Sequence, residues 1–239
     1  MSFDTNLFWD SLFSREFANG ALLAIVVALI AQAGGIVIGF LLALIRMNKV
    51  PVLSHIAWFY IWILRALPTL LVLLIVWNAF PQFIPSMKDP WFTPFIAACI
   101  GLGFQEGAYM SEILRSALSA VDEGQNTAAR ALGMTPIQSM RRVLIPQMIR
   151  VAIPPTSNEF INMIKYTSLA SVIALQELLT RAQVQVASTF RYAEYYAAAA
   201  VYYLVIVSVL TIAQSRLEKR YLWTSRQPHV TTPVETETP

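Results

Sequence analysis

The sequence predicts an all-α fold that crosses a membrane five times, and three observations predict it. Of the 239 residues, 56% are hydrophobic and only 13% are charged, whereas a soluble domain carries about a quarter charged residues. The chain also contains several apolar runs close to the roughly 20 residues that a transmembrane helix needs. Finally, Lys and Arg gather in alternate connections between these runs, which is the pattern of cytoplasmic loops.

Three of the five predicted spans are strong. They are uncharged runs of 25, 22 and 21 residues at 21–45, 66–87 and 195–215. The second run contains three prolines and is extended backwards by residues 50–64 through a single charge, Arg65. Because proline removes a backbone donor and disfavours a helical residue before it, we expect breaks within this run.

The other two predicted spans are weaker. Residues 90–105 form an uncharged run of 16 that continues into a more polar helix. Residues 151–176 are interrupted by two adjacent prolines and by two charges, Glu159 and Lys165. We expect the proline pair to break the start of this span.

The charges predict which side each connection faces. Basic residues follow the first span, the third span and the last span, whereas residues 1–18 carry more acidic than basic side chains. The predicted organisation is an outer N-terminal segment at 1–18, a membrane domain at 19–218 and an inner tail at 219–239. Residues 227–239 are polar and contain two prolines, which predicts disorder.

Several function classes are disfavoured by composition. The net charge of +3 would suit a nucleic-acid partner, but the basic residues sit in short loops between apolar runs, where they act as topology signals. Cys99, His55 and His229 are too few and too scattered for a metal site or a catalytic constellation. No Gly-x-x-x-x-Gly-Lys-Ser/Thr motif occurs, so any ATP is bound by another chain. The chain is therefore predicted to be neither an enzyme nor a cofactor-binding protein.

The connection at 120–148 predicts two short helices joined by a tight turn. Asp122 and Thr135 are placed as N-caps, each followed three residues later by Gln in a capping-box pattern. Gly133 lies where a left-handed residue would end the first helix. Pro136 begins the second helix, and Pro146 is expected to limit it. Such a hairpin can dock into a groove of a soluble partner, although a plain amphipathic surface loop fits the same pattern.

The same connection resembles a family motif. Thr127-Ala128-Ala129, three residues, Gly133, nine residues and Val143-Leu144-Ile145-Pro146 are similar to the Glu-Ala-Ala loop of inner-membrane permeases of binding-protein-dependent ABC importers. Thr127 replaces the family Glu, which weakens a polar contact to the ATPase. The resemblance implies that the following residues couple the chain to that ATPase: Ala128, Ala129, Gly133, Met134, Pro136 and Pro146.

From residue 19 to about 215 the chain resembles the polar amino-acid permeases of this family. The similar stretches are Arg65–Pro68, Ala108–Arg115, Pro154–Ile161 and Lys165–Leu169. The resemblance implies a five-helix type I ABC importer permease fold with a cytoplasmic coupling-helix hairpin, located in the inner membrane. The implied partners are an ABC ATPase dimer that holds ATP and Mg, a second permease subunit (identical or paralogous), a periplasmic solute-binding protein and an amino acid.

Polar residues at membrane depth are the candidate substrate site, because charges there usually face a cavity or a partner. Glu159 and Tyr166 are seven residues apart and share one helical face. One interpretation is that Glu159, Tyr166 and Asn158 line a pore. The alternative is that Glu159 pairs with an Arg of a neighbouring helix and only holds the bundle together. Relatives that move cationic amino acids often carry an acid at the position of Tyr166, so the resemblance favours a neutral or acidic substrate.

Two further charged residues belong to this candidate site. Glu106 either lines the pore or is simply hydrated near the end of its span. Arg65 either neutralises Glu106 or Glu159, or extends to an interface. A second charged pair, Glu112 and Arg115, is spaced to interact within one helix. A secondary transporter working without an ATPase is the alternative function, and five spans without an inverted repeat count against it.

Overall fold

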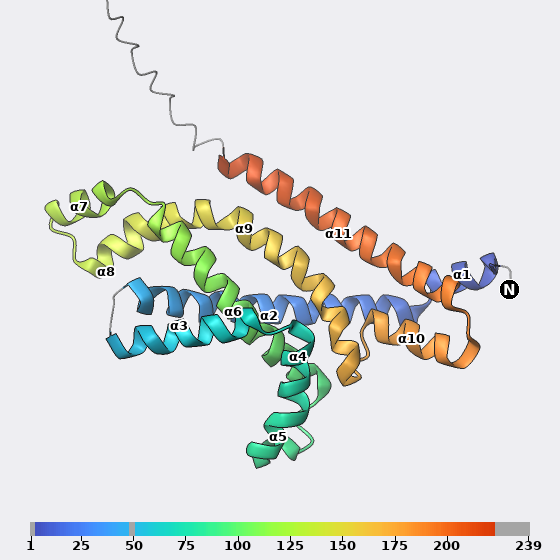
Figure 1. Ribbon diagram of the computed structural model, residues 1–239. Coiled ribbons are helices and arrows are strands. Elements are labelled where there is room, and N and C mark those ends of the chain that lie inside the picture. The colour runs from blue at the N-terminus through green and yellow to red at the C-terminus, as the bar shows by residue number, and fades with distance from the viewer. Residues whose placement is uncertain (1–2, 48–50, 223–239) are drawn as a thin grey trace, which may run out of the picture.

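A computed structural model describes residues 3–47 and 51–222, and every regular element in these ranges is helical (Figure 1). The predicted tail at 227–239, His229 and the basic Lys49 lie outside the described residues. The elements in chain order are α1 (Thr5–Leu12), α2 (Arg15–Met47), α3 (Pro51–Ala66), α4 (Thr69–Leu74), η1 (Ile75–Ala79), α5 (Phe80–Phe83), η2 (Pro85–Lys88), α6 (Pro94–Ser119), α7 (Glu123–Ala131), α8 (Pro136–Ser139), η3 (Met140–Leu144), α9 (Ile145–Tyr166), η4 (Thr167–Ile173), α10 (Leu178–Thr189) and α11 (Tyr192–Leu222).

Two described helices, α2 and α11, are long and apolar enough to cross a membrane as single straight elements, with mean hydropathies of 2.6 and 2.1. They contain the predicted spans 21–45 and 195–215. Helices α6 and α9, with 26 and 22 residues, correspond to the two weaker spans. Both exceed the length that a crossing needs, and their polar residues explain why hydropathy identifies them less clearly.

The second predicted span is bent. Helix α3 and the helical segment Thr69–Phe83 meet at 109°, with Pro68 as the N-cap of α4. The break exposes carbonyl groups at the end of α3, and the Gln105 side-chain amide of α6 donates to two of them, Leu64 O at 3.2 Å and Leu67 O at 3.0 Å. A residue on a neighbouring helix thus supplies hydrogen-bond donors to carbonyl groups that the bend at Pro68 leaves without intrahelical partners.

Two expectations about proline were wrong. Pro154 and Pro155 lie inside α9 without breaking it, and Pro146 does not limit the second hairpin helix. Instead α8 continues through the π-helical segment η3 into α9, with Pro146 in the first turn of α9. The π-helical turn η3 ends at Leu144, just before Pro146, and such a local widening accommodates a proline. Neighbouring groups in membrane bundles compensate for the hydrogen bonds that proline inside a helix removes.

Helices α2 and α6 pack closely through glycine. Gly35 and Gly39 are spaced by four residues on α2, the small-xxx-small pattern of membrane helix pairs. A Cβ atom built on Gly35 would lie 2.4 Å from Glu106 Cγ, and one built on Gly39 would lie 2.5 Å from Met110 Cβ. The close approach of these helices therefore buries Glu106.

The two ends of the bundle differ (Figure 1). Helices α7 and α8 lie at one end, whereas α1, α10 and the start of α11 lie at the other. There the Asp4 amide donates to Glu194 Oε1 at 2.9 Å, and the Tyr202 hydroxyl donates to the Leu12 carbonyl at 2.8 Å. The first long helix begins at Arg15, within the segment 1–18 that the sequence assigned to the outside.

Candidate functional site

The hairpin α7–α8 is built largely by its own residues. Asp122 caps α7, as expected, and accepts from the Gly124 amide at 2.6 Å. The predicted capping box with Gln125 is not formed, because the Gln125 side-chain oxygen accepts instead from Gln147 of α9 at 3.3 Å. The first turn of α7 is thereby tied to the helix that follows the hairpin.

The turn between α7 and α8 has the predicted geometry. Gly133 is left-handed, with φ +80°. The Met134 amide donates to the Ala129 carbonyl at 3.1 Å and the Gly133 amide to Arg130 at 2.9 Å, which is the Schellman pattern. Thr135 and Gln138 then form the reciprocal capping box, at 2.9 and 3.3 Å.

The hairpin presents a small apolar surface. Leu132 and Ile137, on either side of the turn, are each 80% exposed. The Ser139 hydroxyl donates to Asn126 Oδ1 at 2.8 Å and links α8 to α7. Ala129 is buried in the hairpin, whereas Ala128, Pro136 and Pro146 are exposed. This arrangement is a preformed protrusion with an apolar tip.

A small pocket of about 10 Å³, the acidic pocket, lies inside the bundle, where α4, α6 and α9 meet. Glu106 is 2% exposed, and its Oε1 atom has no hydrogen-bond partner among the described residues. Tyr166 lines the same small pocket, so the structure brings together two residues of the predicted site. The other lining residues were not predicted as site residues: Thr69, Leu102, Gln105, Tyr109 and Met163.

The remaining α9 residues lie around this pocket. Glu159 is near enough to act electrostatically on Glu106 and on Tyr166, and Lys165 acts on Glu159 in turn. No Arg forms an ion pair with Glu159 in the described ranges. Asn158 is exposed on α9 and does not line the pocket.

Arg65 does not neutralise either acid, because no ion pair within residues 3–47 and 51–222 joins it to Glu106 or Glu159. Its guanidinium carbon lies 5.5 Å from the centre of the Tyr109 ring. Arg65 faces a separate cavity of about 400 Å³. The lining residues of this basic cavity are Arg46, Trp58, Ile61, Trp62, Arg65, Ala66, Tyr109 and Glu112.

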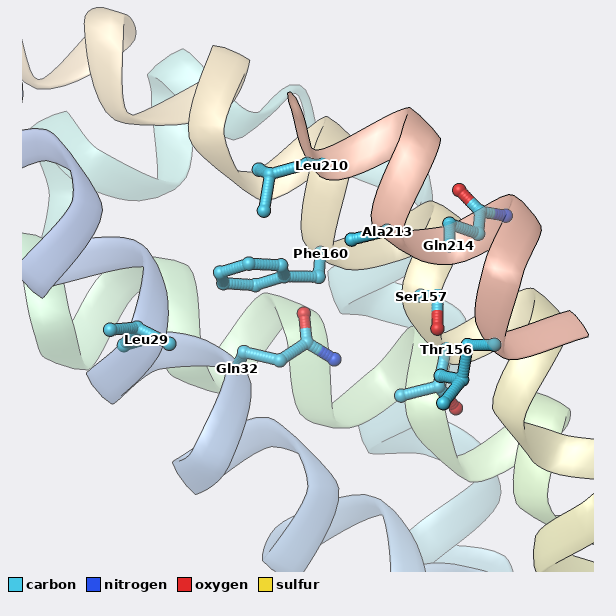
Figure 2. Close-up of a pocket in the computed structure, with 9 residues that line it drawn as sticks. Leu29, Gln32, Thr156, Ser157, Phe160, Leu210, Ala213 and Gln214 are labelled. Atoms are coloured by element: carbon cyan, nitrogen blue, oxygen red, sulfur yellow. The ribbon is translucent and has the colours of Figure 1, made fainter. Parts of the chain in front are cut away.

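A third cavity, of about 420 Å³, lies between α2, α9 and α11 and is almost entirely apolar (Figure 2). Gln32 extends into it from α2; its amide nitrogen donates to Met110 Sδ at 3.5 Å, and its oxygen has no partner among the described residues. No charged side chain lines this cavity. It therefore suits an apolar occupant rather than a zwitterion.

Comparisons with known proteins agree with this architecture. Residues 35–223 match the family described as binding-protein-dependent transport system inner membrane component. The chain is 39% identical over 227 residues to the arginine transport system permease protein ArgU of Corynebacterium glutamicum, covering 89% of this chain and 72% of ArgU. It is 33% identical over 220 residues to the glutamine transport system permease protein GlnP of Escherichia coli K12, covering 92% and 98%.

Solved structures show the same fold. A crystal structure of an amino acid ABC transporter with histidines matches at a TM-score of 0.81 and 34% identity, covering 92% of this chain and all of that one. The inward-facing MetNI methionine ABC transporter matches at a TM-score of 0.74 and 17% identity, covering 91% and 99%, and supports the fold alone. The five-helix type I importer fold is thus confirmed, and the chain belongs to the inner-membrane permease components of binding-protein-dependent ABC importers, within the amino-acid group.

Proposed function

We propose that this chain passes a polar amino acid with a neutral or acidic side chain through the membrane, after a periplasmic binding protein has delivered it. A separate ATPase dimer, holding ATP and Mg, drives the cycle, and a second permease subunit completes the pore. One observation carries the proposal: Glu106 is buried with an unpartnered oxygen in the small acidic pocket beside Tyr166. A buried acid without a partner is costly unless a ligand supplies one.

Charge matching supports the substrate class. Glu106 is available for the ammonium group of an amino acid. Lys165 is near enough to act electrostatically on Glu159, which weakens the attraction of Glu159 for a cationic side chain. Tyr166 offers a hydroxyl and a ring face, which suit a neutral or acidic side chain. Asn158, exposed on the same helix, is proposed to contact the substrate before it enters the pocket.

The proposed orientation places the N-terminus in the periplasm and the C-terminus in the cytoplasm. The exposed tip of the hairpin, with Leu132 and Ile137 beside Gly133, would then meet the ATPase. Its apolar side chains and its position at the end of the bundle opposite α1 support this assignment. Accessibility of tags at the two ends tests the orientation, and labelling of both ends from the same side of the membrane would contradict it.

Uptake by the reconstituted complex, normalised to assembled protein, tests the substrate site. We expect Glu106→Gln to reduce uptake at least about tenfold, because a charge-assisted hydrogen bond contributes roughly 1.5–3 kcal/mol. Glu159→Gln and Tyr166→Phe should change which amino acids are accepted, while assembly and basal ATPase activity remain. Asp10→Asn, on the exposed α1, is the control.

The outcomes separate the alternatives. Unchanged kinetics for several amino acids in all three variants would remove these residues from the site. Loss of assembled complex in Glu159→Gln would indicate a structural role instead. Preferential uptake of arginine or lysine by the unmodified complex would contradict the proposed substrate class, because it would require a second acid to pair with the cationic side chain.

A further inference from the structure

The basic cavity between α2, α3 and α6 contains an unmatched cation. Glu112 is paired with Arg46 of α2 and also with Arg115, at 2.8 Å. Its single negative charge is therefore already shared by two cations. Arg65 contacts the Tyr109 ring and has no carboxylate partner within the described residues. Arg65 is exposed on this chain, so its guanidinium is accessible to a ligand. A charge at membrane depth normally faces a cavity or a partner, because an unpaired charge there is costly.

The position of this cavity relates it to the acidic pocket. Tyr109 lines both spaces, and Glu106, Tyr109 and Glu112 follow one another at intervals of three residues along α6. Since α6 continues towards α7, the basic cavity lies between the acidic pocket and the hairpin end of the bundle. Arg65 and Thr69 likewise lie on opposite sides of the bend between α3 and α4.

The lining chemistry suits a carboxylate attached to a small organic body. The planar guanidinium of Arg65 offers donors that match the two oxygens of a carboxylate. Trp58 and Trp62 stack at 6.1 Å with an interplanar angle of 7° and form one wall. Their rings provide apolar surface for the rest of the ligand. The acidic pocket, of about 10 Å³, and the basic cavity, of about 400 Å³, thus carry charges opposite to those of the two ends of an amino acid.

We infer that the basic cavity is a second station on the transport path, in which Arg65 receives the substrate carboxylate after the molecule has passed Tyr109. The inference rests on the proposed function, because it takes the acidic pocket as the first station, where Glu106 holds the ammonium. Arg46 adds positive electrostatic potential to the cavity, although it is itself paired with Glu112. Tyr109 forms the partition between the stations and positions Arg65 through its ring.

Fluorescence of Trp58 and Trp62 in the assembled complex tests this directly, without the binding protein. The complex is placed in phosphatidylcholine nanodiscs, and the ligand-induced change in tryptophan emission is measured. The change assigned to Trp58 and Trp62 is the part that disappears in the Trp58→Phe, Trp62→Phe double variant. The probes are glutamine and arginine, together with their decarboxylated forms, 4-aminobutanamide and agmatine. We expect at least one of the two amino acids to change the emission and neither amine to do so. Arg65→Gln should raise the half-saturating concentration at least about tenfold, and Arg65→Lys should raise it less.

Two controls separate this inference from the proposed function. Arg216→Gln, at the exposed end of α11, should leave the response unchanged, and co-purification of the subunits checks that Arg65→Gln assembles. Glu106→Gln should preserve the tryptophan response while reducing uptake. If Glu106→Gln preserved both the tryptophan response and uptake, the first station would be rejected and the second would be kept. The second station would be overturned if the amines changed the emission as much as the amino acids do, or if neither amino acid changed it. It would also be overturned if Arg65→Gln left the half-saturating concentration unchanged. A response only to added phosphatidylglycerol would also overturn it and would assign the cavity to a lipid headgroup.

Discussion

The coupling hairpin and the acidic pocket are both proposed functional regions, but they depend on different kinds of contact. In the hairpin, Gly133, Thr135 and Gln138 interact with residues at most a few positions away. In the pocket, Glu106 is buried by Gly35, which lies 71 residues earlier in the chain. Local interactions therefore specify the protruding part of the molecule, whereas helix packing specifies the site inside the membrane.

The largest expected effect comes from placing a side chain at Gly35. Gly35→Val adds a Cβ that would lie 2.4 Å from Glu106 Cγ and 3.1 Å from the Glu106 backbone carbon, so α2 and α6 must separate. Overpacking of this kind costs about 1–3 kcal/mol or more. We expect loss of most of the assembled complex, measured by size-exclusion chromatography after co-purification. Gly34→Ala is the matched control, because its Cβ meets nothing within 4 Å; equal losses in the two variants would contradict this account.

An intermediate effect is expected at Gly133. Gly133→Val places a β-branched residue at φ +80°, at a cost of about 1–2 kcal/mol. Because the turn lies outside the helix bundle, the complex should still assemble while ATP hydrolysis is uncoupled from uptake. The ratio of uptake to hydrolysis in proteoliposomes measures this. Gly133→Asn should retain more coupling, since asparagine tolerates the left-handed region, and wild-type uptake by the valine variant would show that the turn is not the docking element.

The smallest effect is expected at Thr135. Thr135→Ala removes the side chain that accepts from the Gln138 amide at 3.3 Å, and loss of an N-cap costs about 1 kcal/mol. Hydrogen exchange of the α8 amides should become faster, and uptake should fall less than twofold. Thr135→Ser keeps the hydroxyl and should behave as the parent protein. Unchanged exchange in Thr135→Ala would mean that η3 and α9 hold α8 without its cap.

The same distinction explains what could be read from the sequence. The left-handed Gly133, the Thr135 capping box and the Glu112–Arg115 pair all follow from residues close in sequence. The partners of Arg65 do not: its interaction with Tyr109 depends on how α3 packs against α6. The uninterrupted course of α9 through Pro154 and Pro155 was likewise missed, because the breaking tendency of proline is a local rule that neighbouring helices can override.

Some residues of the pocket were within reach of the sequence. Tyr109 follows Glu106 by three residues on the same helix, so a shared helical face could have identified it. Pro68 indicated a break just before Thr69, but the angle of 109° that brings Thr69 to the pocket depends on tertiary packing. The four-residue spacing of Gly35 and Gly39 was also visible and could have predicted the close contact of α2 with another helix.

Gln105 gives the pocket a mechanical property. Its amide is tied to the Leu64 and Leu67 carbonyls at the bend, and its neighbour in the chain is Glu106. A rotation of α6 would therefore move the bend between α3 and α4 together with the Glu106 side chain.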